Sequence, residues 1–143
     1  MSGATCVLCA IAARVEPGSF VHEDEDVVGI MSLDQPTPYK VLVLPRAHVE
    51  TIYDLSDELG GALFRATARL ARAVRAASGC SGLNLVQSNG RTAGQEVPHF
   101  HLHLVPRAQD DGIVLAWPPR RLERAELDAL AADICRNIER AAA

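Results

Sequence analysis

Three of the chain's five histidines occupy alternate positions, His99, His101 and His103, in the run His-Phe-His-Leu-His-Leu-Val. Because successive side chains of a strand point to opposite faces, we predict a strand over Val97–Val105 with all three imidazoles on one face. The apolar residues between the histidines would then pack into a core on the other face. A chain with this run therefore requires a sheet that has a polar, chemically competent face above an apolar anchor.

The rest of the sequence predicts an α+β domain with an antiparallel sheet of about five strands. Short β-prone runs predict strands, and apolar residues at helical spacing predict helices. Ser56 is a good N-cap for a long helix, and Gly79 a good C-terminal stop. The further strands are expected at Ser19–Glu23, Val27–Ser32, Lys40–Leu44 and Leu83–Gln87, and the helices at Cys6–Val15, at residues 56–78 and at about Arg121–Ala142.

Length and charge limit the kind of protein that this chain can be. With 143 residues, of which 48% are hydrophobic, the sequence is typical of a single globular domain, 1–143. The formal net charge of −4 argues against nucleic acid as a partner. The apolar runs are too short to span a bilayer, and residues 1–5 carry no positive cluster, so we expect a cytoplasmic protein that has no membrane partner.

An imidazole row has two chemical uses. It can bind a metal, or it can supply a nucleophile and an acid for a reaction at phosphorus. The loop at residues 88–95 favours phosphate chemistry, because its Gly and Asn residues offer backbone N–H groups and Gln95 offers an amide donor. The alternative is three histidines without function on an exposed strand.

The histidine run resembles the signature of the histidine triad (HIT) family of nucleotide-binding hydrolases and transferases. Three further segments support the resemblance. Residues 6–11 resemble the amino-terminal helix of zinc-bearing, bacterial-type members, residues 43–49 the strand and loop that carry another family histidine, and residues 93–98 the approach to the triad. The resemblance covers about residues 6–107 in the family's order, and a carboxyl-terminal extension, 108–143, lies outside it.

The resemblance implies a mechanism. His101 would attack the α-phosphorus of a nucleotide and form a covalent nucleotidyl-histidine, which water then hydrolyses. The main-chain carbonyl of His99 would accept a proton from the other ring nitrogen of His101, and His103 would assist departure of the leaving group. Gln95 and Ser88 occupy positions that resemble phosphate-contacting residues of the family.

The resemblance also implies a structural zinc site. Cys6, Cys9, His48 and His99 would form a Cys₂His₂ set, which zinc favours in closed tetrahedral sites. We expect about one Zn²⁺ per chain and no catalytic metal, because no ligand position remains open. A redox pair or two unrelated thiols are the alternatives for the C-x-x-C spacing, and His22 is expected on the surface.

The nucleoside pocket departs from the family pattern. The family's acidic residue, which accepts hydrogen bonds from both ribose hydroxyls, should lie at Ser32, with Asp34 nearby as a possible substitute. Ser88 replaces a common asparagine, although Asn89 is adjacent. The base would pack against apolar side chains that could equally be ordinary core residues, namely Val7, Leu8, Ile11, Ile30 and Leu33.

These features predict a hydrolase that cleaves a purine nucleoside 5′-phosphoramidate or a related nucleotidyl conjugate. A dinucleoside polyphosphate hydrolase is a second reading, which uses the same nucleophile. A nucleotide-binding module with vestigial turnover is a third, motivated by Ser32. By resemblance alone we expect a homodimer.

Overall fold

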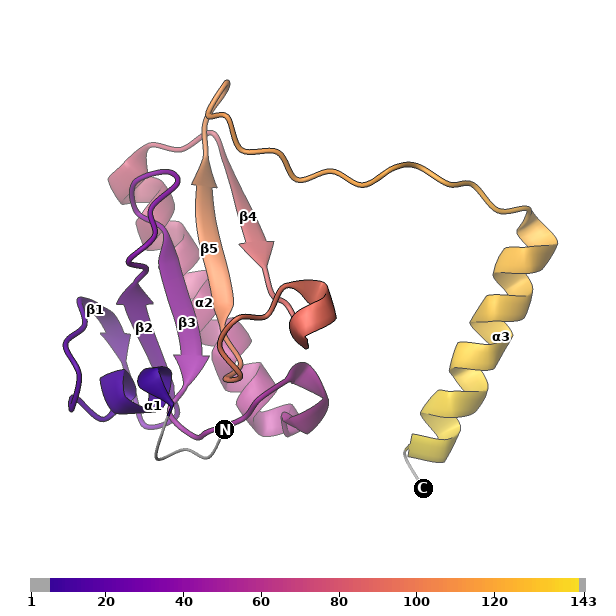
Figure 1. Ribbon diagram of the computed structural model, residues 1–143, viewed down its shortest axis with the longest axis horizontal. Coiled ribbons are helices and arrows are strands. Elements are labelled where there is room, and N and C mark those ends of the chain that lie inside the picture. Colours follow the sequence, from indigo (N-terminus) through magenta and orange to yellow (C-terminus); the bar gives the residue numbers. More distant parts are fainter. Residues whose placement is uncertain (1–5, 142–143) are drawn as a thin grey trace. The chain divides into compact units, whose positions relative to one another are not determined.

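The strands of the computed structural model, which describes residues 6–141, form one antiparallel sheet in the order β1-β2-β3-β5-β4 (Figure 1). This architecture confirms the predicted α+β class with about five strands. The strands are β1 (Phe20–Glu23), β2 (Val27–Met31), β3 (Val41–Pro45), β4 (Gly82–Val86) and β5 (Leu102–Arg107); the helices are α1 (Val7–Ala12), α2 (Asp57–Ser78) and α3 (Arg124–Ala141), with short 3-10 turns η2 (Ile52–Asp54) and η3 (Arg91–Ala93).

Helix α2 covers one face of the sheet, behind it in Figure 1. The helix begins where the sequence predicts, because the Ser56 side chain accepts a hydrogen bond from the backbone N–H of Leu59. It ends at Gly79, whose φ of 67° is readily adopted by glycine. Its buried side chains pack against alternate residues of β2, β3 and β5 in a cluster that includes Leu63, Leu70, Val74, Val27, Val43 and Leu104.

Helix α1 packs on the opposite face of the sheet. Leu8 and Ala12 are buried against Val28, Ile30 and Leu44, which alternate along β2 and β3 with the residues that face α2. The helix is shorter than predicted. Arg14 adopts a positive φ of 62°, which ends the helical path before Val15.

Strand β5 begins later than predicted. The segment from Val97 to His101 lies outside the sheet ladder, so only His103 of the three alternating histidines is in the strand. Pro98 has no N–H to donate, and the Phe100 N–H donates instead to the Val49 carbonyl at 2.6 Å. The alternation persists without the ladder, because Phe100 and Leu104 are both buried on the α2 side.

The chain divides into two compact units, one that ends at Ile113 and one that begins at Val114. We call the first the core unit. Its last turn is fastened by the Arg107 guanidinium, which donates to Asp111 at 2.6 and 2.9 Å, to Asn84 at 2.7 Å and to the Ile113 carbonyl at 2.8 Å. The Arg107 side chain holds the pKa of the Asp111 carboxyl well below its usual value.

The second unit contains α3, which confirms the expected carboxyl-terminal helix but starts at Arg124 instead of about Arg121. Its apolar residues Leu127, Leu130, Ile134 and Ile138 are exposed. Among the described residues, no helix combines the length and apolarity needed to cross a bilayer.

Contact between α2 and the sheet predicts the effect of a methyl group at Gly29. A Cβ there would lie 2.7 Å from Leu70 Cδ1 and 3.1 Å from His22 Cβ. We expect Gly29→Ala to lower the free energy of unfolding by about 1–3 kcal/mol, as overpacking does, in a urea titration. Gly60→Ala is the matched control: its Cβ would meet nothing within 4 Å, and it should raise stability by about 0.5–1 kcal/mol. Equal stability of the two variants would contradict close packing at Gly29.

Candidate functional site

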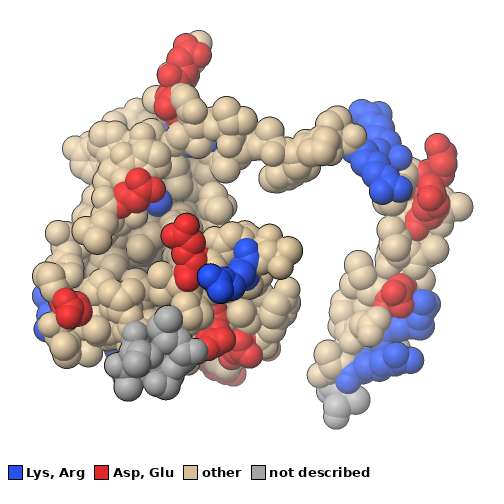
Figure 2. Space-filling model, viewed as in Figure 1, with Lys and Arg blue, Asp and Glu red and all other residues tan. Residues whose placement is uncertain are grey.

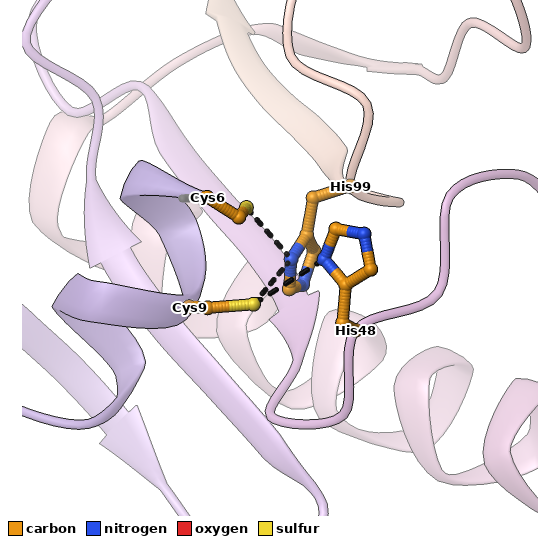
Figure 3. A group of neighbouring side chains, drawn as sticks. All are labelled: Cys6, Cys9, His48 and His99. Atoms are coloured by element: carbon orange, nitrogen blue, oxygen red, sulfur yellow. Dashed lines mark hydrogen bonds between the residues drawn. The ribbon is translucent and has the colours of Figure 1, made fainter. Parts of the chain in front are cut away.

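Two cysteines and two histidines from separate segments converge beside α1. Cys6 precedes the helix and Cys9 lies within it, whereas His48 follows β3 and His99 precedes β5. The side chains point toward one another (Figure 3), and their four donor atoms all lie within 4.8 Å of one another. The structure thus brings together all four residues of the set that was expected to bind zinc.

The geometry of this cluster suits a tetrahedral metal. The Cys6 and Cys9 Sγ atoms both lie 3.4 Å from His99 Nδ1, and Cys9 Sγ lies 3.3 Å from His48 Nδ1. In a site with Zn–S and Zn–N bonds of about 2.3 and 2.0 Å, neighbouring S and N ligands are about 3.5 Å apart. These three spacings between sulfur and nitrogen are therefore close to those that a zinc ion requires.

The proton positions at the cluster also suit a metal. His99 is fully buried, and its Nε2–H donates to the Pro45 carbonyl at 2.9 Å, which leaves the Nδ1 lone pair facing the thiols. Burial lowers the pKa of His99 and so favours the neutral ring. Burial and the neighbouring Cys6 raise the pKa of Cys9 to about 11. A bound cation would offset that penalty by stabilising the thiolate.

His101 has a fixed ring orientation. Its Nδ1 lies 2.6 Å from the main-chain oxygen of His99, so Nδ1–H donates to that carbonyl and Nε2 keeps its lone pair. The side chain is partly buried. An imidazole held in this tautomer can act as a nucleophile through Nε2 without first losing a proton.

His103 lies against His101, with the ring centroids 4.8 Å apart in an edge-on arrangement. Its Nδ1 is buried and has no hydrogen-bond partner among the described residues. Burial, followed by the nearby charges of His101 and Lys40, lowers the pKa of His103 to about 4. The His103 ring is therefore neutral throughout the physiological pH range.

The loop before the triad is held by its own amide side chains. Gln95 is buried; its Oε1 accepts from the Gly90 N–H at 2.7 Å, and its Nε2 donates to the Glu50 carbonyl at 2.7 Å. Asn89 Oδ1 accepts from the Ile52 N–H at 2.7 Å. Both amides therefore shape the loop in this structure, and the phosphate contacts expected of Gln95, Asn89 and Ser88 stay predictions.

The residues expected around the nucleoside are not equivalent in the structure. Leu8 and Ile30 are buried in the core beneath α1, and Ile11 is partly buried. Val7 is about half exposed and Leu33 is fully exposed. Ser32 is buried at the end of β2. A role for any of them in binding the base or the ribose stays a prediction.

Lys40 is a polar residue that the sequence reasoning missed. It is buried at the start of β3, and its Nζ lies 3.6 Å from Asp34 Oδ2. The signal available in the sequence was its rarity, because it is the chain's single lysine. Its charge acts on His103, which connects it to the imidazole pair. His22, expected on the surface, is only partly exposed and hydrogen-bonds Asp24 at 2.9 Å.

This sequence and this fold are similar to those of known proteins. Residues 13–110 match the HIT domain model. The crystal structure of a HIT family member from Bacillus subtilis has a TM-score of 0.89 and 34% identity, covering 92% of this chain and 96% of that one. A zinc-bound histidine triad protein from Mycobacterium smegmatis has a TM-score of 0.74 and 32% identity, covering 92% and 99%.

A curated relative from Saccharomyces cerevisiae, named as an adenosine 5′-monophosphoramidase, is 26% identical over 137 residues, or 95% of this chain and 84% of the relative. The matched HIT domain includes the whole run from His99 to His103. The Cys₂His₂ group in addition fits the zinc-bearing branch. This chain belongs to the histidine triad (HIT) family.

Proposed function

We propose that this protein is a nucleotidyl hydrolase that cleaves purine nucleoside 5′-phosphoramidates or closely related conjugates. Membership of the HIT family supports a nucleotide hydrolase, and the relative named as an adenosine 5′-monophosphoramidase supports the finer assignment. The observation that carries the proposal is the 2.6 Å hydrogen bond from His101 Nδ1 to the His99 carbonyl. It leaves Nε2 as a nucleophile with a defined direction of attack.

In the first step, His101 Nε2 forms a bond to the α-phosphorus while the bond from phosphorus to the leaving nitrogen breaks. The leaving amine takes up a proton from solvent water, and the nucleotide remains covalently attached to the ring. As Nε2 becomes bonded to phosphorus, the ring gains positive charge, which the His99 carbonyl stabilises at Nδ1–H. In the second step, water attacks phosphorus and gives up a proton to solvent; the bond from phosphorus to His101 breaks, its electron pair returns to Nε2, and the nucleoside monophosphate is released.

His103 and the loop at residues 88–95 complete the reaction centre in this proposal. The edge-on contact with His101 places His103 beside the reacting atoms. Because its ring is neutral, His103 can donate or accept a hydrogen bond at the phosphate oxygens or the leaving group. The Gln95 side chain, which bridges Gly90 and residue 50, holds the loop in shape and retains a second amide hydrogen for the phosphate.

The Cys₂His₂ group would hold one structural Zn²⁺. The metal would tie α1 and the loop after β3 to the segment that carries His99, and it would supply no ligand position for substrate. The main chain of His99 meanwhile contacts His101. A metal held by this group would therefore stabilise the position of the carbonyl that accepts the hydrogen bond from His101.

Localisation in the cytoplasm and assembly as a homodimer stay predictions, as do the two other functional readings. A dinucleoside polyphosphate hydrolase would use the same His101 and differ in the leaving group that it accepts. A nucleotide-binding module would bind AMP with no turnover of either substrate class. Parallel assays with adenosine phosphoramidate and a dinucleoside polyphosphate separate all three.

The nucleophile assignment predicts the effect of His101→Ala. We expect turnover of adenosine phosphoramidate to fall by at least about 10³-fold, because the variant lacks the imidazole that the proposal assigns as the nucleophile. A rapid acid quench followed by mass spectrometry should detect the adenylylated wild-type chain and none in the variant. His22→Ala, which removes a histidine from β1, is the control and should retain activity. A His101→Ala protein with most of its activity would refute the assignment.

Burial of His103 predicts its titration. In a pH series of ¹H–¹⁵N spectra, we expect its ring to titrate with a pKa of about 4, below the ordinary value of about 6.5. The unfolded chain binds this proton at higher pH than the folded one, so His103 makes stability fall as pH drops from about 6.5 toward 4. His103→Gln assigns the signal, and a midpoint near 6.5 would show that the ring is well solvated.

The Cys₂His₂ group predicts a metal content. Protein purified without a histidine tag should contain about one zinc per chain by mass spectrometry of the metal, and Cys9→Ser should lose most of it. Cys80→Ser is the matched control, because Cys80 lies outside the cluster of four donors. Wild-type protein with less than a tenth of an equivalent of zinc would remove this part of the proposal and leave the nucleophile untouched.

A further inference from the structure

The chain's single lysine is buried on the face of the sheet that bears the imidazoles. The side chain of Lys40 is only 10% exposed, although lysine is rarely buried without a strong partner. Its anionic neighbour is Asp34, 3.6 Å away, whose side chain is 88% exposed. An exposed carboxylate is well screened by water, so this pair does not account for the burial of an ammonium group.

Lys40 and Ser32 lie directly across from each other at the ends of β3 and β2. The ladder that pairs Met31 with Val41 continues through a hydrogen bond from the Ser32 N–H to the Lys40 carbonyl at 3.0 Å. Paired residues of neighbouring strands share a face. The two side chains therefore start from neighbouring positions on one face of the sheet, and both residues are buried.

The same face continues to the triad. Leu42, two residues after Lys40, pairs with His103 on β5. Because side chains alternate along a strand, Lys40, Leu42 and His103 point to the same side of the sheet. Lys40 therefore lies on the same face as His103, two residues along β3 from its cross-strand partner, and its charge acts on His103.

The loop between β2 and β3, which ends at Lys40, is held by hydrogen bonds to one amide side chain. The Gln35 side chain donates to the carbonyls of Ser32 and Lys40, both at 2.7 Å, and accepts from the Lys40 N–H at 2.9 Å. The amide thus fastens the two ends of the loop together. Figure 2 looks onto the core unit from the side opposite α2 and shows charged side chains scattered singly or in small groups over a mostly uncharged surface. The face of the core unit that Figure 2 shows therefore carries no broad basic patch among the described residues.

We propose that Lys40 and Ser32 form an anion-binding subsite, and that the nucleotide on which this protein acts carries a second phosphoryl group beside the one that His101 attacks. The inference rests on the proposed function and narrows its substrate class. An ammonium and a hydroxyl both donate to phosphate oxygens, whereas the carboxylate that the family resemblance leads one to expect at Ser32 would repel them. The same exchange separates dinucleotide sites that bind a ribose hydroxyl from those that bind a ribose phosphate.

The second phosphoryl group has two possible positions, on the ribose or further along the 5′-phosphate chain. Calorimetric titration with AMP, adenosine 3′,5′-bisphosphate, adenosine 2′,5′-bisphosphate and ADP distinguishes them. We expect at least one of the doubly phosphorylated nucleotides to bind about tenfold more tightly than AMP. A preference for a bisphosphate places the group on the ribose. A preference for ADP places it on the leaving group, as in the alternative substrate class of dinucleoside polyphosphates.

Variants test whether this preference belongs to the subsite. Lys40→Met should reduce the ratio of the affinity for the preferred doubly phosphorylated nucleotide to the affinity for AMP to about one. Lys40→Arg should preserve part of this preference. For a ribose phosphate, Ser32→Asp should reverse the preference in favour of AMP. Asp34→Asn, which removes the competing carboxylate, should increase it. Arg72→Met is the matched control, since it removes one exposed cation from α2 on the other side of the sheet and should leave the ratio unchanged.

A measurement on the unaltered protein covers variants that fail to fold. Biosynthetic labelling with ¹³C-lysine gives a single lysine side chain in the spectrum, and its ε-methylene signal should shift more with the preferred nucleotide than with AMP. Equal affinities for all four nucleotides, or a preference that survives Lys40→Met, would overturn the proposal. If the wild-type protein shows the lysine-dependent preference but does not turn over adenosine phosphoramidate, the proposed reaction is refuted and the subsite is retained.

Discussion

The hydrogen bond between His101 Nδ1 and the main-chain oxygen of His99 is the interaction on which the rest of the site depends. It requires a carbonyl that cannot move, and His99 is fixed from its other side. Its ring is fully buried, donates to the Pro45 carbonyl and lies against two thiols that come from the other end of the chain. His99 therefore belongs to both groups of side chains: its ring lies in the Cys₂His₂ group, and its main-chain oxygen accepts the hydrogen bond from His101.

The sheet makes this double use possible. Helix α2 covers one face of the sheet and α1 packs on the other. Apolar side chains on both faces are therefore buried against a helix. Phe100 and Leu104 anchor the histidine segment against α2, while His99 and His103 point to the side that carries α1 and Lys40. The segment that holds His99 and His101 is free of ladder hydrogen bonds. That freedom lets the His99 carbonyl accept from a side chain two residues away instead of from a neighbouring strand.

Features encoded by neighbouring residues were predicted from sequence, whereas features that depend on distant partners were predicted only where the family resemblance supplied them. Ser56 and Gly79 mark the ends of α2 by local chemistry, and both ends were predicted correctly. The start of β5 was wrong, because whether residues 97–101 join a ladder depends on which carbonyls lie opposite them. The four metal-binding candidates were found through the family resemblance, which supplies long-range proximity that spacing alone cannot. The burial of Lys40 was missed because it results from pairing between β2 and β3 and from the Gln35 clamp, neither of which has a local signature.

Nucleotide chemistry on this face imposes two demands that conflict in most surroundings. A phosphate ester is bound best by positive charge, yet the attacking imidazole must be neutral to have a lone pair. A ring of arginines would satisfy the first demand and leave little control over the second. A single ammonium meets the first demand without a broad basic surface, and its charge adds to the larger effect of burial that lowers the pKa of the neighbouring His103. The small negative net charge of the chain is then no obstacle, since binding depends on one fixed lysine and on nearby hydrogen-bond donors, and these act at distances where the field of the whole protein has little effect.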